Sequence, residues 1–188
     1  MAISTTCIGA YPKPDYIHIG NFAETEQQDN GVTRAFTYTQ DSAAEVPEAM
    51  LIRATGEAIR DQLDCGIDIP TDGEQRRENY IHYHCRHLDG FDFRNLTSKV
   101  HRNGAAVADL PTINARVEPH GDHFLDRDFR IAQGFSDRPI KITLPGPLSI
   151  IDTTANLYYR TERELAYDLA TALNFEIRAR AAAGCQYI

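Results

Sequence analysis

A short stretch, residues 66–77, constrains the fold of this chain more than any other. It reads G-I-D-I-P-T-D-G-E-Q-R-R, so a glycine suited to a helix end is followed by a short β-branched run. Where that run would end as a strand, Glu74 stands beside Gly73 with two arginines just behind it. A carboxylate in this position suits a ligand better than a core. The stretch therefore predicts a functional loop at the end of a strand.

The same plan of strand and helix recurs along the chain. Four short β-branched or apolar runs predict strands at residues 3–8, 67–70, 140–144 and 185–188. A strand, a helix and a second strand in that order imply a parallel pair with a right-handed crossover. The sequence therefore predicts an α/β fold whose functional residues lie in loops after the strands.

Three helices are expected between these strands. The first begins at an S-x-x-E capping box, residues 42–45, and its apolar face is expected to comprise Val46, Ala49, Ile52, Gly56, Ile59 and Leu63. A second helix is expected at residues 75–88. The third has a capping box at residues 161–164 and a glycine stop at Gly184, and its buried stripe is expected to comprise Ala166, Leu169, Ala170, Leu173, Ile177 and Ala181.

Four strand-helix units amount to half of a (β/α)8 TIM barrel, which needs eight. We therefore expect residues 1–188 to be the N-terminal half of one barrel domain. The weakly patterned residues 89–138 are expected to form a long insertion, and residues 94–100 to belong to a hairpin outside the main sheet. The other half of the barrel is expected from the same chain or from a second one, because a parallel strand buried on both faces should not be a free terminus.

Composition excludes several classes of protein. The formal net charge of -8 argues against a nucleic-acid partner, because binding to the phosphate backbone depends on clustered Lys and Arg. No apolar run approaches the roughly 18 residues that a membrane span needs. The four cysteines are scattered without a C-x-x-C pair, which is typical of reduced thiols and a cytoplasmic location.

Five motifs occur in order along the chain: T-T-x-I-G-x-Y-P near the N-terminus, G-E-x-x-R, L-x-G-F-x-F, G-P after the third expected strand, and A-G-C-x-Y-I at the end. Each motif is weak alone, but the ordered set covers nearly all 188 residues. The set resembles the catalytic domain of cobalamin-independent methionine synthases. That resemblance implies a (β/α)8 barrel that transfers a methyl group to a thiol held as thiolate on zinc.

The resemblance also implies roles for individual residues. Glu74 matches the family glutamate that binds the amino group of homocysteine. Ile8, Gly9 and Ala10 match the loop whose backbone holds the amino-acid part of that substrate, although the family usually has Ser at the position of Ala10. Arg102 falls where the family has an arginine near the folate.

Two departures from the family concern the methyl donor and the metal. The family's folate-stacking tryptophan corresponds to Thr153, and this chain has no tryptophan at all. The donor is therefore left open between a folate and a methylated corrinoid. The family's zinc ligands are expected beyond Ile188, so no metal ligand and no catalytic residue is assigned within this chain.

Three functions are compatible with these observations. The first is a zinc-dependent methyltransferase in methionine biosynthesis that acts on a small thiol such as homocysteine. The second is an alkyl or thiol transferase of the same superfamily, and the third is a non-catalytic half-barrel that serves as a binding module. An Asp-Glu-Pro after Ile188 with a downstream His-x-Cys would favour the two enzymes.

Some of these residues also have simpler explanations. Glu74 could be a solvated carboxylate at a helix start, favoured by the helix dipole. Arg76 or Arg77 could pair with Glu74 or Asp72 or bind a ligand carboxylate, and surface ion pairs are an equal alternative. The cluster His82, His84, Cys85 and His87 invites a metal site. Because consecutive positions on a helix diverge, we expect it to be a histidine-rich, partly exposed helix face instead.

Overall fold

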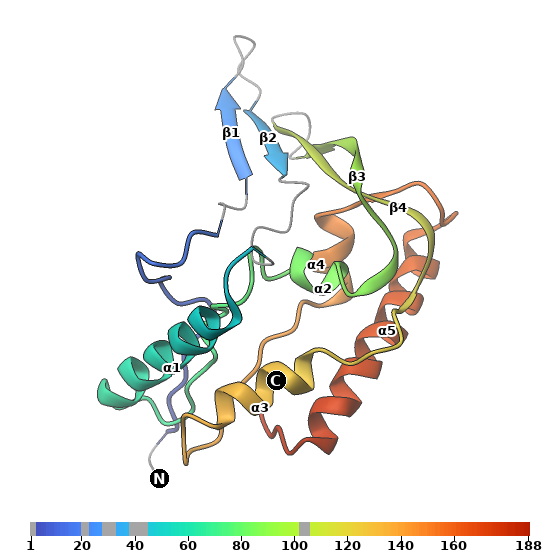
Figure 1. Ribbon diagram of the computed structural model, residues 1–188. Coiled ribbons are helices and arrows are strands. Elements are labelled where there is room, and N and C mark those ends of the chain that lie inside the picture. The colour runs from blue at the N-terminus through green and yellow to red at the C-terminus, as the bar shows by residue number, and fades with distance from the viewer. Residues whose placement is uncertain (1–2, 20–22, 28–32, 38–44, 102–105) are drawn as a thin grey trace.

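The computed structural model describes residues 3–19, 23–27, 33–37, 45–101 and 106–188 (Figure 1). The helices in these ranges are α1 (Glu48–Asp64), α2 (His82–Cys85), α3 (Leu125–Gln133), α4 (Pro147–Asp152) and α5 (Glu162–Ala182). The strands are β1 (Ala23–Gln27), β2 (Thr33–Thr37), β3 (Leu88–His101), β4 (Ala106–Pro119) and β5 (Ala155–Asn156). The chain is therefore an α/β protein.

The four segments predicted as strands lie side by side in parallel. Isolated bridges join Thr6 to Ile69, Thr71 to Lys141, and Lys141 to Tyr187. The predicted parallel neighbours and their order are thus confirmed. Each segment contributes only isolated bridges and no regular ladder, so none of the four is itself a strand.

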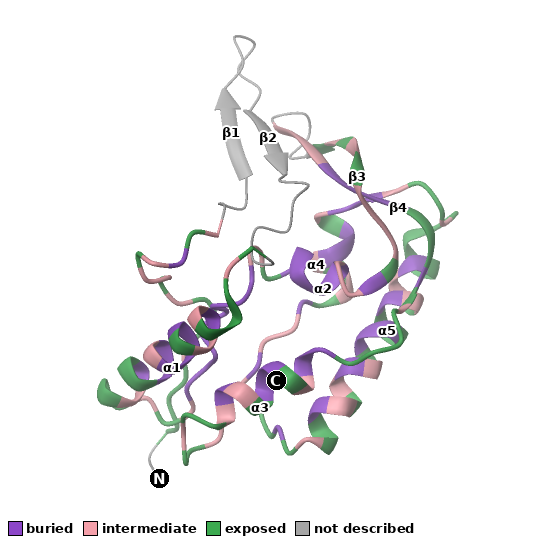
Figure 2. Ribbon diagram, in the orientation of Figure 1, coloured by how far each residue is buried: buried purple, intermediate pink, exposed green. Residues whose placement is uncertain are grey.

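The buried faces of α1 and α3 pack against these four segments, and the buried face of α5 packs mainly against α2, β4 and α4 (Figure 2). Ile140 and Ile142, on the third segment, are fully buried in a cluster with Ile59 of α1 and Leu125 and Phe129 of α3. At roughly 25 cal/mol for each Å² of apolar surface removed from water, such clusters are the main stabilising contribution of this layer. The helices thereby fix the ends of the four segments, where the candidate site lies.

The first predicted helix is present with a partly different buried face. Gly56 and Ile59 are buried as expected, and Gly66 follows α1 with a φ of 84°, as a helix-ending glycine should. The other buried residues are Leu51, Ala54, Thr55, Ala58 and Gln62. The expected Ala49 is exposed, because α1 begins only at Glu48 and its first turn lies outside the core. The predicted capping box at residues 42–45 falls mostly outside the described residues.

Helix α5 confirms the predicted capping box. Thr161 accepts a hydrogen bond from the Glu164 backbone, and the Glu164 side chain reaches back to the Thr161 N–H. The predicted stripe was wrong at four positions: Ala166 and Ile177 are half-buried, and Ala170 and Ala181 are exposed. The helix is rotated relative to the prediction, and it buries Leu165, Leu169, Ala172, Leu173, Glu176 and Arg180.

Two of the residues on that buried face are charged, which explains the error. Glu176 accepts from the backbone N–H groups of Phe124 and Leu125 at 3.4 and 3.2 Å, at the start of α3. Arg180 donates to the carbonyl of Ile142 at 3.2 Å. The buried face of α5 therefore contains hydrogen-bonded charged residues as well as apolar ones. The spacing of apolar residues alone cannot locate such a face.

The predicted helix over residues 75–88 was wrong. Only the four residues of α2 are helical, and they follow a series of turns. Asn79 closes one turn by accepting from the N–H groups of Ile81 and His82 at 2.7 and 2.8 Å. The side chains of residues 75–77 are all buried, and each pairs with a distant part of the chain. These residues therefore do not divide into a buried and an exposed side, as they would on a surface helix.

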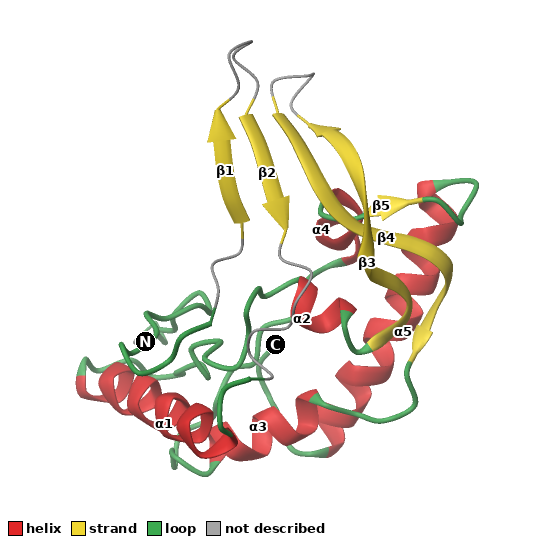
Figure 3. Cartoon of the chain, turned by 45° about the horizontal axis from the view of Figure 1, so that its top comes forward, coloured by secondary structure: helices red, strands yellow, loops and turns green. Residues whose placement is uncertain are grey.

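The long region expected as an insertion contains a hairpin and α3. Strands β3 and β4 pair antiparallel over most of their length, so the hairpin expected near residues 94–100 is present and longer than predicted. β4 also pairs in parallel with β2 and β5, in a sheet of order β1-β2-β4-β3. Figure 3 shows this sheet standing apart from the four bridged segments.

Candidate functional site

The backbone at Glu74 is in the left-handed conformation. Gly73 has a φ of 66° and Glu74 a φ of 54°, and Glu74 is the only non-glycine with positive φ among the described residues. This conformation costs a non-glycine residue roughly 1–2 kcal/mol. The N–H of Glu74 donates to Asp72 Oδ1 at 3.1 Å, which helps to hold the turn. A strained residue at the end of a buried segment marks a candidate functional site.

The Glu74 carboxylate is held by two neighbours. Thr143 Oγ1 donates to Glu74 Oε1 at 2.7 Å, and Arg77 Nη1 lies 3.6 Å from the same oxygen. Glu74 is only 9% exposed, and no helix starts at it. The alternative of a solvated carboxylate at a helix start was therefore wrong.

Arg77 is the buried cation at the centre of this cluster. Its Nη2 lies 3.2 Å from Asp72 Oδ2, and its Nη1 donates to Thr143 Oγ1 at 2.8 Å. Burial alone would lower the pKa of Arg77, but the carboxylates of Asp72 and Glu74 outweigh burial and raise it. One arginine thus pairs with two carboxylates inside the protein. The alternative that Arg77 pairs with Glu74 or Asp72 is confirmed, and that of a surface ion pair is wrong for Arg77.

The loop at residues 8–10 lies directly against Glu74. A methyl group on Gly9 would stand 2.5 Å from Glu74 Oε1 and 2.9 Å from Thr143 Cγ2, so only glycine fits without displacing one of them. Thr71 Oγ1 donates to the Gly9 carbonyl at 2.9 Å. Ile8 and Ala10, on either side of the buried Gly9, have exposed side chains. Four of the predicted site residues, Ile8, Gly9, Ala10 and Glu74, are therefore brought together.

Lys13 reaches the same turn from the other side. Its Nζ donates to the backbone carbonyls of Glu74 and Gln75 at 2.9 and 3.3 Å. Burial lowers the pKa of Lys13 to about 8, against the opposing effect of the Glu74 and Asp72 carboxylates. The cluster therefore contains two carboxylates, Asp72 and Glu74, and two cations, Arg77 and Lys13, of which Lys13 comes from a distant part of the sequence.

Of the two predicted donor-side residues, Thr153 is not part of this cluster. Arg102 lies outside the described residues. Thr153 ends α4, where its hydroxyl donates to the Ser149 carbonyl at 2.8 Å and its own carbonyl lies 3.2 Å from His82 Nε2. Lys99 of β3 donates to three carbonyls at the end of α4 and just after it, those of Ile151, Asp152 and Thr154. Arg76 pairs with Glu48 and Asp128 and does not contact Glu74 in the described contacts.

The histidine-rich stretch is mostly buried. His82, His84 and Cys85 are at most 2% exposed, so the prediction of a partly exposed face was wrong for these three, whereas His87 is half-buried. Burial lowers the pKa of His82 to about 4 and that of His84 in the same direction, so both rings are neutral at pH 7. The His87 ring stacks on Phe124 with a centroid distance of 3.9 Å. Across the described residues, no three His, Cys, Asp or Glu side chains are grouped to hold a metal ion.

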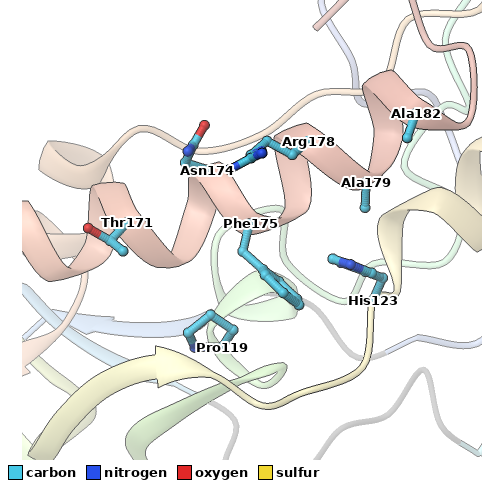
Figure 4. A pocket seen from close by; sticks show the side chains of 8 residues that line it. All are labelled: Pro119, His123, Thr171, Asn174, Phe175, Arg178, Ala179 and Ala182. Atoms are coloured by element: carbon cyan, nitrogen blue, oxygen red, sulfur yellow. The ribbon is translucent and has the colours of Figure 1, made fainter.

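A groove of about 660 Å³ lies elsewhere, on the outer side of α5 (Figure 4). The His123 ring stacks on Phe175 there, with centroids 4.0 Å apart. The remaining lining residues are Pro119, Thr171, Asn174, Arg178, Ala179 and Ala182. None of them belongs to the Glu74 cluster, so the groove is not part of the candidate site. Separately, no helix within the described part of the chain is long and apolar enough to cross a membrane.

Sequence reasoning missed two contributors, Thr143 and Lys13, and gave Asp72 only as a possible partner of an arginine. Lys141 and Thr143 alternate with the fully buried Ile140 and Ile142. In an extended segment, polar residues that alternate with buried apolar ones point away from the apolar core. That pattern could have identified Thr143 as a candidate site residue. The contacts of Asp72 and Lys13 depend on turns that no local pattern reveals.

The chain matches the model of a protein family described as cobalamin-independent synthase, catalytic domain, over residues 3–188. Methionine synthase of Sulfolobus acidocaldarius is 30% identical over 177 residues, which are 94% of this chain and 47% of that protein. Methionine synthase of Saccharolobus solfataricus is 28% identical over 187 residues, which are 99% of this chain and 51% of that protein. The chain thus spans about half the length of the curated relatives it matches.

Solved structures give the same result. A B12-independent methionine synthase from Shewanella sp. W3-18-1, solved in complex with selenomethionine, superposes with a TM-score of 0.72 at 30% identity, over 96% of this chain and 49% of that one. A putative vitamin-B12 independent methionine synthase from Listeria monocytogenes superposes with a TM-score of 0.60 at 19% identity, which shows likeness of fold alone.

Proposed function

Because this chain belongs to the cobalamin-independent synthase catalytic-domain family, we propose that it takes part in methyl transfer to a small amino-acid thiol, of which homocysteine is the best candidate. The proposed role of this chain is to bind the amino-acid end of that thiol. Its relatives are named methionine synthases, and one of them was solved with selenomethionine, an amino acid with the same ammonium and carboxylate groups.

The observation that carries this proposal is the held carboxylate of Glu74 beside the loop at residues 8–10. The Thr143 hydroxyl at 2.7 Å and Arg77 at 3.6 Å fix the carboxylate before any ligand arrives. A fixed carboxylate can accept a charge-assisted hydrogen bond from a substrate ammonium without losing further side-chain entropy. The backbone of the exposed residues Ile8 and Ala10, on either side of Gly9, would receive the rest of the amino acid.

The proposed fold around this site is a (β/α)8 barrel. Residues 1–188 would be its N-terminal half, with the four bridged segments as its first four strands and the region at 89–138 as its insertion. The remaining half would come from the same chain or a second one. The parallel bridges in chain order and the match to half of each relative support this assignment.

The described residues do not fit the zinc that the family resemblance implies, since they hold no group of three possible ligands. The proposal therefore places the metal ligands outside them, and no step is routed through the metal. The residues of this chain would bind and orient the thiol. Activation of its sulfur would depend on groups beyond this chain.

We propose a methyl donor whose binding does not need an aromatic side chain to stack on, as the binding of a folate does in the family. Thr153 stands at the expected tryptophan position, and its hydroxyl is already bonded to its own helix. Thr153 therefore has no ring on which a ligand could stack, and its hydroxyl already donates its proton to the Ser149 carbonyl. A methylated corrinoid is the donor that this arrangement favours, and an alkyl transferase acting between thiols is the second candidate function.

The experiment is a methyl-transfer assay on the protein together with the rest of its barrel. Homocysteine would be supplied with either methyltetrahydrofolate or methylcobalamin, and methionine formation measured by mass spectrometry, with metal content measured on the same sample. We expect methionine from homocysteine, and a higher rate with methylcobalamin. A folded, complete barrel that methylates no thiol with either donor would contradict the methyltransferase and favour a binding module.

A further inference from the structure

We propose that Lys13 is a positioning residue for Glu74: by holding the carbonyls of the left-handed turn, it aims the Glu74 carboxylate at the ammonium group of the substrate. This inference rests on the proposed function, because it deepens the role of the same site. Nothing in the family match assigns a role to this lysine.

The first observation is where the Lys13 ammonium donates its hydrogen bonds. Both bonds go to main-chain carbonyls, of Glu74 at 2.9 Å and of Gln75 at 3.3 Å. These carbonyls belong to two consecutive peptide units of the same turn. The turn is strained, because Glu74 has a φ of 54°. An ammonium with several donors can hold both units at once, which a neutral apolar side chain could not.

The second observation is that the segment carrying Lys13 is fastened to the same turn by other bonds. The N–H of Tyr11 donates to the Gly73 carbonyl at 3.0 Å. Gln75 Nε2 donates back to the carbonyls of Tyr11 and Pro12 at 3.1 and 3.2 Å. The loop and the turn therefore form one unit, in which Lys13 supplies the only cation among these contacts.

The third observation is the partial burial of that cation. Lys13 is half-buried among Asp72, Glu74, Arg77 and Glu78, and burial is the largest influence on its pKa. Removing an ammonium from water is costly unless its donors are bonded. Two of the three N–H donors of Lys13 are bonded to the turn carbonyls, so the Glu74 carboxylate stays available to a ligand ammonium while Lys13 holds its backbone.

The test compares two thiols that differ only in the amino group: homocysteine and its desamino analogue, a mercaptobutanoate. KM and kcat would be measured for both in the complete, active barrel. Lys13→Met removes the two hydrogen bonds and keeps the side-chain length. We expect KM for homocysteine to rise about tenfold, as for a lost charge-assisted hydrogen bond, with KM for the analogue within about twofold.

Two further variants separate positioning from general damage. Lys13→Arg keeps a cation with several donors and should restore at least part of the homocysteine KM. Arg138→Met is the control. Arg138 is another cation that donates to a backbone carbonyl, that of Ile67 at 2.9 Å, and it makes no described contact with the Glu74 turn. This variant should leave the ratio of the two KM values unchanged. If Lys13→Met does not fold, Lys13→Gln, which keeps a neutral donor, takes its place.

Glu74→Gln distinguishes the two ways of failing. If it removes the preference for homocysteine and Lys13→Met or Lys13→Gln does not weaken it, the positioning role is refuted and the proposed function survives. If Glu74→Gln leaves the preference intact, the proposed amine site itself is wrong. Equal loss of binding for both thiols in the Lys13 variants would make Lys13 a merely structural residue and would overturn the inference.

Discussion

The turn at Glu74 and the residues around Thr153, at the end of α4, are both held by a lysine, and they are built differently. At Glu74 the lysine joins a buried network of Asp72, Arg77 and Thr143 that fixes a carboxylate. At Thr153 the lysine is Lys99, which donates to three main-chain carbonyls, and the Thr153 hydroxyl is bonded to its own helix.

The difference indicates how the two ends of the proposed reaction are recognised. A pre-positioned charge provides strong and specific binding of an oppositely charged group, because little reorganisation remains when the ligand arrives. A loop whose polar groups are satisfied internally offers shape but little electrostatic discrimination. We therefore expect strict selection of the thiol at the Glu74 turn and looser selection of the donor at the Thr153 loop.

The largest expected effect comes from removing the central cation of the Glu74 network. Arg77→Met leaves the buried Asp72 and Glu74 without their guanidinium, and breaking a buried pair in this way costs about 3–5 kcal/mol of unfolding free energy. Lys99→Met, at the other loop, should cost only about 1–2 kcal/mol, because it removes hydrogen bonds without leaving a buried charge. Urea denaturation of both variants measures the difference, and equal losses would contradict the contrast between the loops.

Acid should loosen the Thr153 loop through His82. Burial lowers the pKa of His82 to about 4, below the usual value of 6.5, so its unfolded form binds more protons between these values. Stability is therefore lost as pH falls from about 6.5 toward 4, by up to about 3 kcal/mol from this residue. The unfolding free energy measured against pH should fall less steeply in His82→Gln.

A matched histidine gives the opposite sign. The Asp89 carboxylate raises the pKa of the exposed His120, so its contribution is present at low pH and is lost as pH rises through its folded-state pKa. His120→Gln should therefore slightly steepen the loss of unfolding free energy at low pH. A flatter acid profile in His120→Gln than in His82→Gln would refute the assignment to His82.

Two glycines sharpen the comparison by sterics alone. In Gly9→Ala the added methyl group meets Glu74 Oε1 and Thr143 Cγ2, so the carboxylate must move, and affinity for homocysteine should fall about tenfold or more. In Gly146→Ala, at the start of α4, nothing lies within 4 Å of the added methyl group, and affinity should be unchanged. Calorimetric titration of both variants checks the pair, and an unaltered Gly9→Ala would show that the loop does not constrain Glu74.

The smallest expected effects come from a pair of threonines. Thr143→Val removes the hydroxyl that donates to Glu74 and should raise KM for the thiol about tenfold. Thr153→Val removes a hydroxyl that is bonded only within its helix, and it should change KM for either substrate less than about twofold. Steady-state kinetics on both variants would contradict the account if Thr153→Val had the larger effect.

The features that were predictable from sequence are the local ones. The capping box of Thr161 and Glu164 and the helix-ending Gly66 and Gly184 depend on neighbours within a few residues, and the structure has all of them. The parallel order of the four segments followed from their alternation with helices. Such features need no knowledge of distant contacts.

The features that sequence reasoning missed depend on long-range pairing. Arg77 and Thr143 are 66 residues apart in sequence and are joined by a hydrogen bond. Arg77 therefore lies in a turn that such long-range contacts hold, and not in the helix predicted for residues 75–88. The buried Glu176 and Arg180 rotate α5 away from its apolar stripe for the same reason. Buried charged groups follow their partners, and no local period shows where those partners lie.

The central claim is that Glu74 binds the ammonium of an amino-acid thiol, and a crystal structure of the complete barrel with homocysteine or methionine tests it most directly. The account predicts the ligand nitrogen within about 3.2 Å of a Glu74 carboxylate oxygen, with the ligand against the backbone of residues 8–10. A ligand bound with its nitrogen on other groups, and Glu74 still engaged only with Thr143 and Arg77, would contradict it.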